Sequence, residues 1–75
     1  MAVSVRDYVA ATLRAEIARR GLTQRQVAEK CGKSQPWVSD RVTGQTTCDV
    51  EDLELLATAL DVHISAFLPA PERVA

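Results

Sequence analysis

Residues 22–44 read LTQRQVAEKCGKSQPWVSDRVTG, and this stretch decides the expected fold. Thr23 followed by Gln26 has the spacing of a helix capping box, in which each side chain binds the other residue's backbone N–H. Gly32 is suited to the left-handed conformation that ends a helix, and Ser34 then provides a second N-cap. The stretch therefore predicts two short helices joined by a tight link.

That arrangement is the spacing of a helix-turn-helix. Ala28 provides a small side chain where two steeply crossing helices approach each other. In the second helix, residues 34–43, Val38 and Val42 share one face at about 100° per residue. Pro36, Asp40 and Thr43 point outward, and the flanking positions are Gln35, Trp37, Ser39 and Arg41. A surface rich in short donors and acceptors suits the reading of base edges in a DNA major groove.

The rest of the chain is also predicted to be helical. Ser4 is the expected N-cap of a helix over residues 5–20, whose apolar side chains recur every fourth position. Asp49 is the expected cap of a fourth helix, and Ser65 that of a short fifth turn. Since no useful stretch alternates with period two, no strand is predicted and the fold class is all-α.

Length and composition indicate one domain. The chain has 75 residues, enough for a single small core. We expect a helix-turn-helix DNA-binding domain over residues 1–68 and a flexible C-terminal tail over residues 69–75. The N-terminus lacks a basic region followed by an apolar stretch, and no apolar run approaches the ~18 residues of a membrane span. We therefore expect a cytoplasmic protein with no secretory signal and no membrane partner.

Cysteine and histidine usage argues against metal chemistry and catalysis. The chain contains Cys31, Cys48 and one histidine, His63. Structural zinc needs four ligands at close paired spacings, and the sequence offers no such set. It also has no Cys–His pair close in sequence and no glycine-rich phosphate loop, so we predict no metal, no cofactor and no enzymatic activity. Cys31 is expected to be a core thiol, and His63 a cap or surface residue.

The net charge of −1 conceals an uneven distribution. Residues 1–45 hold eight bases and four acids, whereas residues 46–75 hold one base and six acids. A polyanion would therefore meet the N-terminal part of the chain. Arg14, Arg25 and Lys33 are expected to form a rim that contacts phosphates. Such a rim adds affinity and salt dependence rather than sequence preference.

Residues 22–35, continued over residues 38–44, resemble the helix-turn-helix of the phage repressor and Cro family, the xenobiotic-response-element-like class. Residues 52–62 are similar to the family's fourth helix, so the resemblance covers about residues 5–68. It implies a compact five-helix, lambda-repressor-like domain that binds double-stranded operator DNA, usually as a homodimer. It further implies a phage or bacterial transcriptional regulator of the repressor or Cro type, located with the nucleoid. No small-molecule effector is evident.

The resemblance also assigns roles to individual residues. In the family, a glutamine that opens the first motif helix contacts a phosphate and braces a second glutamine, which reads a base. These positions match Gln24 and Gln35. The other base-reading positions match Ser34, Pro36, Ser39 and Asp40, and the phosphate-contacting positions match Thr43, Gln45, Thr46 and Thr47. The chain departs from the family pattern at Arg41, where many members have an apolar residue.

Several assignments have a second interpretation. Gln24 and Gln35 are either DNA contacts or ordinary helix caps. Asp40 is a solvated acid unless it accepts a hydrogen bond from a cytosine amino group. Arg41 either contacts a guanine or a phosphate, or pairs with Asp40. Trp37 either packs against a neighbouring helix or contacts the sugar-phosphate backbone or a thymine methyl group.

Apolar residues in the C-terminal part predict a contact surface. Leu55 lies off the apolar stripe of its helix, and with Val62, Ile64 and Phe67 it is expected to form a dimer face. The alternative for these residues is burial beneath the tail. The leading alternative function is a protein-interaction module, such as an antitoxin or adaptor, that would use the same surface. A non-specific architectural DNA binder is disfavoured because Gln, Ser and Asp, rather than Lys and Arg, line the second helix.

Overall fold

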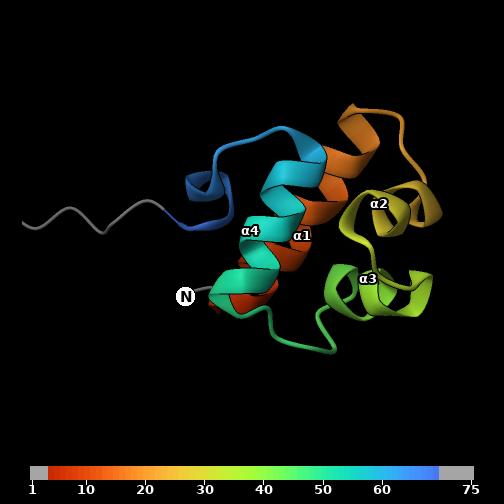
Figure 1. Cartoon of the computed structure of the whole chain (residues 1–75). Helices are drawn as coiled ribbons and strands as arrows, with labels where there is room; N and C mark the ends of the chain where they lie inside the picture. Colours follow the sequence, from red (N-terminus) through yellow and green to blue (C-terminus); the bar gives the residue numbers. More distant parts are fainter. Residues whose placement is uncertain (1–3, 70–75) are drawn as a thin grey trace, which may run out of the picture.

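The structure, a computed structural model, describes residues 4–69. In that part of the chain it has four α-helices and one 3₁₀-helix, and no strand (Figure 1). The elements are α1 (Val5–Arg19), α2 (Gln24–Cys31), α3 (Gln35–Val42), α4 (Val50–Leu60) and η1 (Ile64–Phe67). The all-α prediction is confirmed, and the fifth element is a single 3₁₀ turn rather than an α-helix. Residues 1–3 and all of the expected tail after Pro69 lie outside the described residues.

The helix starts follow the capping residues read from the sequence. Four side chains accept a hydrogen bond from the backbone N–H three positions further on, as predicted, and these caps are Ser4, Thr23, Ser34 and Asp49. The expected Ser65 cap is wrong, since His63 caps η1 and its Nδ1 accepts the Ser65 backbone N–H at 3.1 Å. The imidazole is the better placed acceptor because His63 precedes the turn, whereas Ser65 lies within it.

Two residues end helices in the left-handed conformation. Gly32 ends α2 with φ 69°, which leaves room for the immediate turn into α3. Asp61 ends α4 with φ 56°, and it is the one non-glycine residue with positive φ among residues 4–69. This backbone conformation is strained for a residue with a Cβ atom, although aspartate tolerates it better than most.

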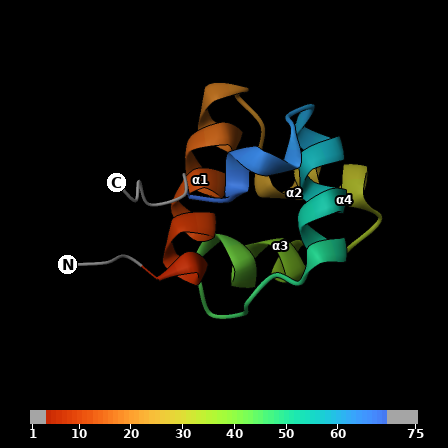
Figure 2. The same ribbon diagram turned by 90° about the vertical axis from the view of Figure 1, so that its left-hand side faces the viewer.

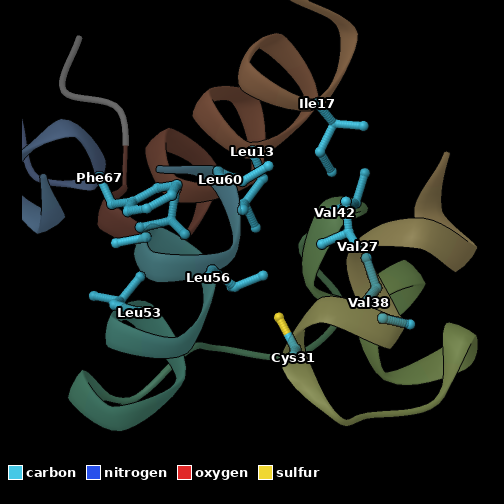
Figure 3. Close-up of a cluster of buried hydrophobic side chains, with 13 residues drawn as sticks. Leu13, Ile17, Val27, Cys31, Val38, Val42, Leu53, Leu56, Leu60 and Phe67 are labelled. Atoms are coloured by element: carbon cyan, nitrogen blue, oxygen red, sulfur yellow. The ribbon is translucent and has the colours of Figure 1, made fainter. Parts of the chain in front are cut away.

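The core collects apolar side chains from all five elements (Figure 3). The largest fully buried side chains are Leu13, Val27, Val38, Leu56, Leu60 and Phe67. Because η1 packs against both α1 and α4, it brings Phe67 between them with no exposed surface. The expected place of Phe67 in a dimer face is therefore wrong. The core position expected for Cys31 is confirmed, with 8% of the residue exposed.

α3 lies at one edge of this bundle. It packs against α2 and α1, and Figure 2 shows it below and between α1 and α4. α2 in turn packs against α4. The two helices of the motif are thus fastened to a scaffold made by α1, α4 and η1. No helix covers the lower side of α3 in this view, where the loop between α3 and α4 passes.

Candidate nucleic-acid interface

α3 is anchored by two valines and leaves its polar side accessible. Val38 and Val42 are 0% and 6% exposed, so the predicted inward face is confirmed. On the rest of the helix, Ser34, Gln35, Pro36 and Thr43 are exposed, and Ser39 and Asp40 are half-buried. The structure therefore brings the predicted base-reading residues together on one helix at the molecular surface. Pro36 lies in the first turn, where its missing N–H costs no helical hydrogen bond.

A hydrogen bond joins the first residues of α2 and α3. Nε2 of Gln35 donates to Oε1 of Gln24 at 3.0 Å, which is the brace that the resemblance implies. The caps of these helices are Thr23 and Ser34, so the interpretation of the glutamines as caps is wrong. The bond leaves the Oε1 acceptor and one N–H of Gln35 available. A neighbouring donor and acceptor on one amide match the N7 and N6 pattern of adenine in the major groove.

The loop after α3 is folded back onto the end of the helix. The backbone N–H groups of Gln45 and Thr46 both donate to the carbonyl oxygen of Asp40, at 2.9 and 3.1 Å. The hydroxyl of Thr43 donates to the carbonyl oxygen of Ser39 at 2.9 Å. Gln45 and Thr47 are exposed and Thr46 is half-buried. The predicted phosphate-contacting residues therefore follow directly from the C-terminal end of α3.

Arg41 does not lie where the sequence placed it. Its side chain is 11% exposed and forms an ion pair with Asp52 in the first turn of α4, with Nη2 and Oδ2 3.2 Å apart. The expected DNA contact and the alternative pairing with Asp40 are both corrected by this geometry. The only sign of this role in the sequence was that Arg41 is charged at a position that is apolar in many family members. Nothing local identified Asp52 as the partner.

Trp37 packs against the protein, which confirms one of its two interpretations. The residue is half-buried and lies against the core cluster. Its ring is stacked on the guanidinium of Arg41, whose Cζ lies 3.9 Å from the ring centroid. Nζ of Lys33 lies 5.6 Å from the same centroid. Trp37 thus joins the turn before α3 to the last turn of the same helix.

The expected phosphate rim is divided between two environments. Arg25 and Lys33 are exposed, at the start of α2 and in the turn before α3. Nη1 of Arg14 instead donates to the carbonyl oxygen of Val42 at 2.7 Å, across 28 residues of sequence. The N–H of Arg14 satisfies a carbonyl that has no partner within the helix, and its positive charge interacts favourably with the negative end of the α3 dipole. This use of Arg14 was not predicted, because no local pattern pairs α1 with the end of α3.

The remaining residues of the expected dimer face differ in exposure. Leu55 is 38% exposed, whereas Val62 and Ile64 are half-buried against the core. Val50 and Leu68, which the sequence reading did not single out, are 72% and 46% exposed. Of the four residues of the expected dimer face, Leu55 is therefore the most accessible.

One small cavity lies between the start of α1 and the loop before α4. Its volume is about 70 Å³, and it is lined by Val5, Arg6, Val9, Arg41, Thr46, Thr47, Cys48 and Leu53. Pockets that hold metabolites are several times larger, at roughly 300–1,000 Å³. Burial raises the pKa of Cys48 to about 11, so this thiol is protonated at neutral pH. A protonated thiol is a poor nucleophile.

Residues 4–69 contain no cluster of three or more His, Cys, Asp or Glu side chains placed to hold a metal ion. None of the helices in this range combines the length and the apolar character needed to span a bilayer.

Comparisons with known proteins agree with the geometry of the motif. The sequence model of a family described as a helix-turn-helix domain matches residues 9–66. A search of curated proteins gave no significant match.

Solved structures of similar shape include three regulators or candidate regulators. The clp gene regulator ClgR from Corynebacterium glutamicum has a TM-score of 0.83 and 27% identity, over 89% of this chain and 87% of that one. The restriction-modification controller protein C.AhdI from Aeromonas hydrophila has a TM-score of 0.78 and 26% identity, over 81% and 92%. The hypothetical transcription factor NHTF from Neisseria has a TM-score of 0.84 and 25% identity, over 91% and 78%.

Proposed function

Since the chain belongs to the helix-turn-helix domain family and is a DNA-binding transcriptional regulator of the Cro/C1 type, we propose that it places α3 in the major groove of an operator. Occupation of the operator then represses transcription, in the manner of a phage or bacterial repressor. The proposed unit is the domain over residues 1–68, acting in the cytoplasm at the nucleoid. It requires no cofactor, no small-molecule effector and no catalysis.

The observation that carries this proposal is the hydrogen bond between Gln24 and Gln35. It holds the amide of Gln35 at the exposed start of α3 before any DNA is bound. A side chain that is already oriented loses less rotamer entropy on binding. The amide of Gln24 keeps both of its N–H donors for a phosphate oxygen. We therefore propose that Gln35 reads an adenine and Gln24 contacts the backbone beside it.

Further contacts follow from the order of side chains along α3. Ser34, Pro36 and Ser39 are proposed to lie along the base edges next to Gln35. Asp40 has no cationic partner among the described residues, and phosphates would repel its carboxylate. We propose that it accepts a hydrogen bond from a cytosine amino group, the pairing that carboxylates make in the major groove.

The proposed backbone contacts flank this surface on both sides. Thr43, Gln45, Thr46 and Thr47 are proposed to bind phosphates beyond the end of α3. Arg25 and Lys33 supply the sequence-independent attraction on the other side. Arg14 retains Nη2 and Nε for the same purpose while Nη1 remains on Val42. The excess of bases over acids in residues 1–45 supports this orientation toward the polyanion.

We further propose that the protein binds its operator as a homodimer. The proposed dimer face consists of the exposed Leu55 and the half-buried Val62 and Ile64, and the buried Phe67 no longer belongs to it. Two copies would present two α3 helices to successive major grooves, about 10 bp apart. Closed two-fold symmetry is the commonest arrangement of soluble oligomers.

The experiment that tests this function is selection of bound duplexes from a random pool at ~150 mM salt, where attraction to phosphates alone is weakened. Enrichment of an inverted repeat with half-sites about 10 bp apart would support a dimeric operator binder. Enrichment of a single half-site would support the base-reading role of α3 and contradict the proposed homodimer. If folded protein enriches no sequence, the proposed function is wrong and the antitoxin or adaptor alternative becomes the better hypothesis.

A Gln35→Glu variant serves as the matched control in that selection. It keeps the length of the side chain and replaces the amide donor by a second acceptor. A changed preference at one base pair of each half-site would assign that position to Gln35. An identical selected site would remove Gln35 from the interface.

A further inference from the structure

Arg41 and Asp52 form an ion pair that fastens α3 to α4. Nε and Nη2 of Arg41 donate to Oδ2 of Asp52 at 3.3 and 3.2 Å. The same oxygen accepts the backbone N–H of Asp49 at 3.3 Å, as part of the capping box that starts α4. One carboxylate oxygen thus joins the last turn of α3 to the first turn of α4.

The third nitrogen of the guanidinium is occupied on α3 itself. Nη1 of Arg41 donates to the carbonyl oxygen of Trp37 at 3.0 Å, while the plane of the group lies over the Trp37 ring. The side chains of Arg41 and Asp52 are 11% and 16% exposed. All three nitrogens therefore have a partner within the protein, and removal of either charge would leave the other poorly solvated.

The position of Arg41 on α3 gives this pair a geometric role. Val38 and Val42 lie almost above one another on the helix and form its main line of contact with the core. Arg41 lies about 100° from Val42 and about 160° from Ser39 around the helix axis. Its bond to Asp52 is a second line of contact, placed on the far side from the polar surface. Two such lines set the rotation of the helix.

That rotation determines where the polar side chains point. The side chains of an α-helix extend to roughly 5–6 Å from its axis, so a roll of about 20° displaces a side-chain tip by about 2 Å. A hydrogen bond to a base does not survive a displacement of that size, because donor–acceptor distances in hydrogen bonds span a range of only about 0.5 Å. Resting on the proposed function, we infer that Arg41 is a positioning residue: through Asp52 it sets the rotation of α3 and hence the sequence preference of Gln35 and Ser39, without touching DNA.

The test compares binding of the selected operator with binding of a scrambled duplex. The variants are Arg41→Met, which keeps an unbranched side chain, and Asp52→Asn, which keeps an acceptor for the Asp49 N–H. Lys30→Met and Glu54→Gln remove the same charges from exposed positions outside this cluster and serve as controls. Both cluster variants are expected to reduce the ratio of the two affinities about tenfold relative to their controls, because base contacts rather than phosphate contacts are lost.

The salt dependence distinguishes positioning from direct contact. A positioning role leaves the slope of log K against log salt the same in Arg41→Met and Lys30→Met. A phosphate contact by Arg41 would instead lower that slope by ~1. Asp52→Asn would then release the guanidinium and tighten binding to both duplexes. Either of these results would overturn the inference.

Trp37, the single tryptophan of the chain, provides a readout that needs no DNA. Loss of the Arg41 stack is expected to increase quenching of its emission by acrylamide in both cluster variants and in neither control. A folded Asp52→Asn protein with unchanged quenching and an unchanged affinity ratio would overturn the inference. If the parent protein selects no operator, the proposed function fails first, and the positioning role fails with it.

Discussion

Replacement of Phe67 by alanine tests whether η1 belongs to the core. The side chain has no exposed surface and lies between α1 and α4. Its transfer from water accounts for roughly 1.5–3 kcal/mol, and the cavity left behind raises the expected loss to about 3–5 kcal/mol. A domain of 75 residues has a free energy of unfolding of only about 4–11 kcal/mol. Phe67→Ala should therefore remove a large share of the stability.

The assay is urea unfolding followed by circular dichroism at several protein concentrations. With a slope of ~1 kcal/mol per molar urea, the midpoint should fall by about 3–5 M or the protein should be unfolded without denaturant. Phe67→Leu, which keeps most of the apolar volume, should lose less than about 1.5 kcal/mol and keep the transition measurable. Leu68→Ala is the matched control, because this neighbour is 46% exposed and should cost less than about 1 kcal/mol.

The competing interpretation is that Phe67 serves a dimer face. In that case Phe67→Ala would weaken self-association, and the unfolding midpoint would depend on protein concentration in the parent and lose that dependence in the variant. A loss below about 1 kcal/mol, together with a shift from dimer to monomer in sedimentation, would refute the core assignment.

Four other changes have expected results. Asp61→Gly should raise the free energy of unfolding by about 0.5–1 kcal/mol in urea titrations, because glycine adopts the φ of 56° without strain, and Asp61→Ala should lower it. Gln35→Ala should weaken binding to the selected operator by ~1–3 kcal/mol and relax preference at one base pair in competition assays. Lys33→Ala should weaken binding to all duplexes alike and reduce the salt slope by ~1, so a sequence-selective loss would contradict a phosphate contact. Burial raises the pKa of Cys48 from 9.0 to about 11 in the folded state, so its contribution to stability is present below pH 9 and is lost as the pH rises to 11. Cys48→Ala should therefore flatten the plot of unfolding free energy against pH between pH 9 and 11.

The elements that could be predicted are those encoded by neighbouring residues. A cap and its partner lie three positions apart, so Ser4, Thr23, Ser34 and Asp49 identified the helix starts from sequence alone. The valines of α3 identified its buried face for the same reason. The Gln24–Gln35 contact spans 11 residues and was reached only through the family resemblance.

The contacts that could not be predicted are made by long side chains across elements. Arg14 reaches Val42 over 28 residues, and Arg41 reaches Asp52 over 11. A helical wheel gives the direction of each Cα–Cβ bond, whereas the guanidinium ends several bonds further and follows the nearest acceptor. Both arginines were assigned to the DNA because of their charge, whereas the fold pairs Arg41 with Asp52 and uses one nitrogen of Arg14 at the end of α3.

Because Arg41 and Trp37 pack against the protein, fewer side chains of α3 are available to contact the proposed operator. Without them, the proposed base-reading surface of one α3 consists of short polar groups, mainly Gln35, Ser39 and Asp40. Each good base contact discriminates by about 1–3 kcal/mol, and a carboxylate among them opposes the attraction to phosphates. One domain therefore has few contacts from which to obtain the ~4–10 kcal/mol that separates specific from non-specific binding. Two domains on one operator double the number of base contacts, and this argues for the homodimer more strongly than the small apolar surface around Leu55 does.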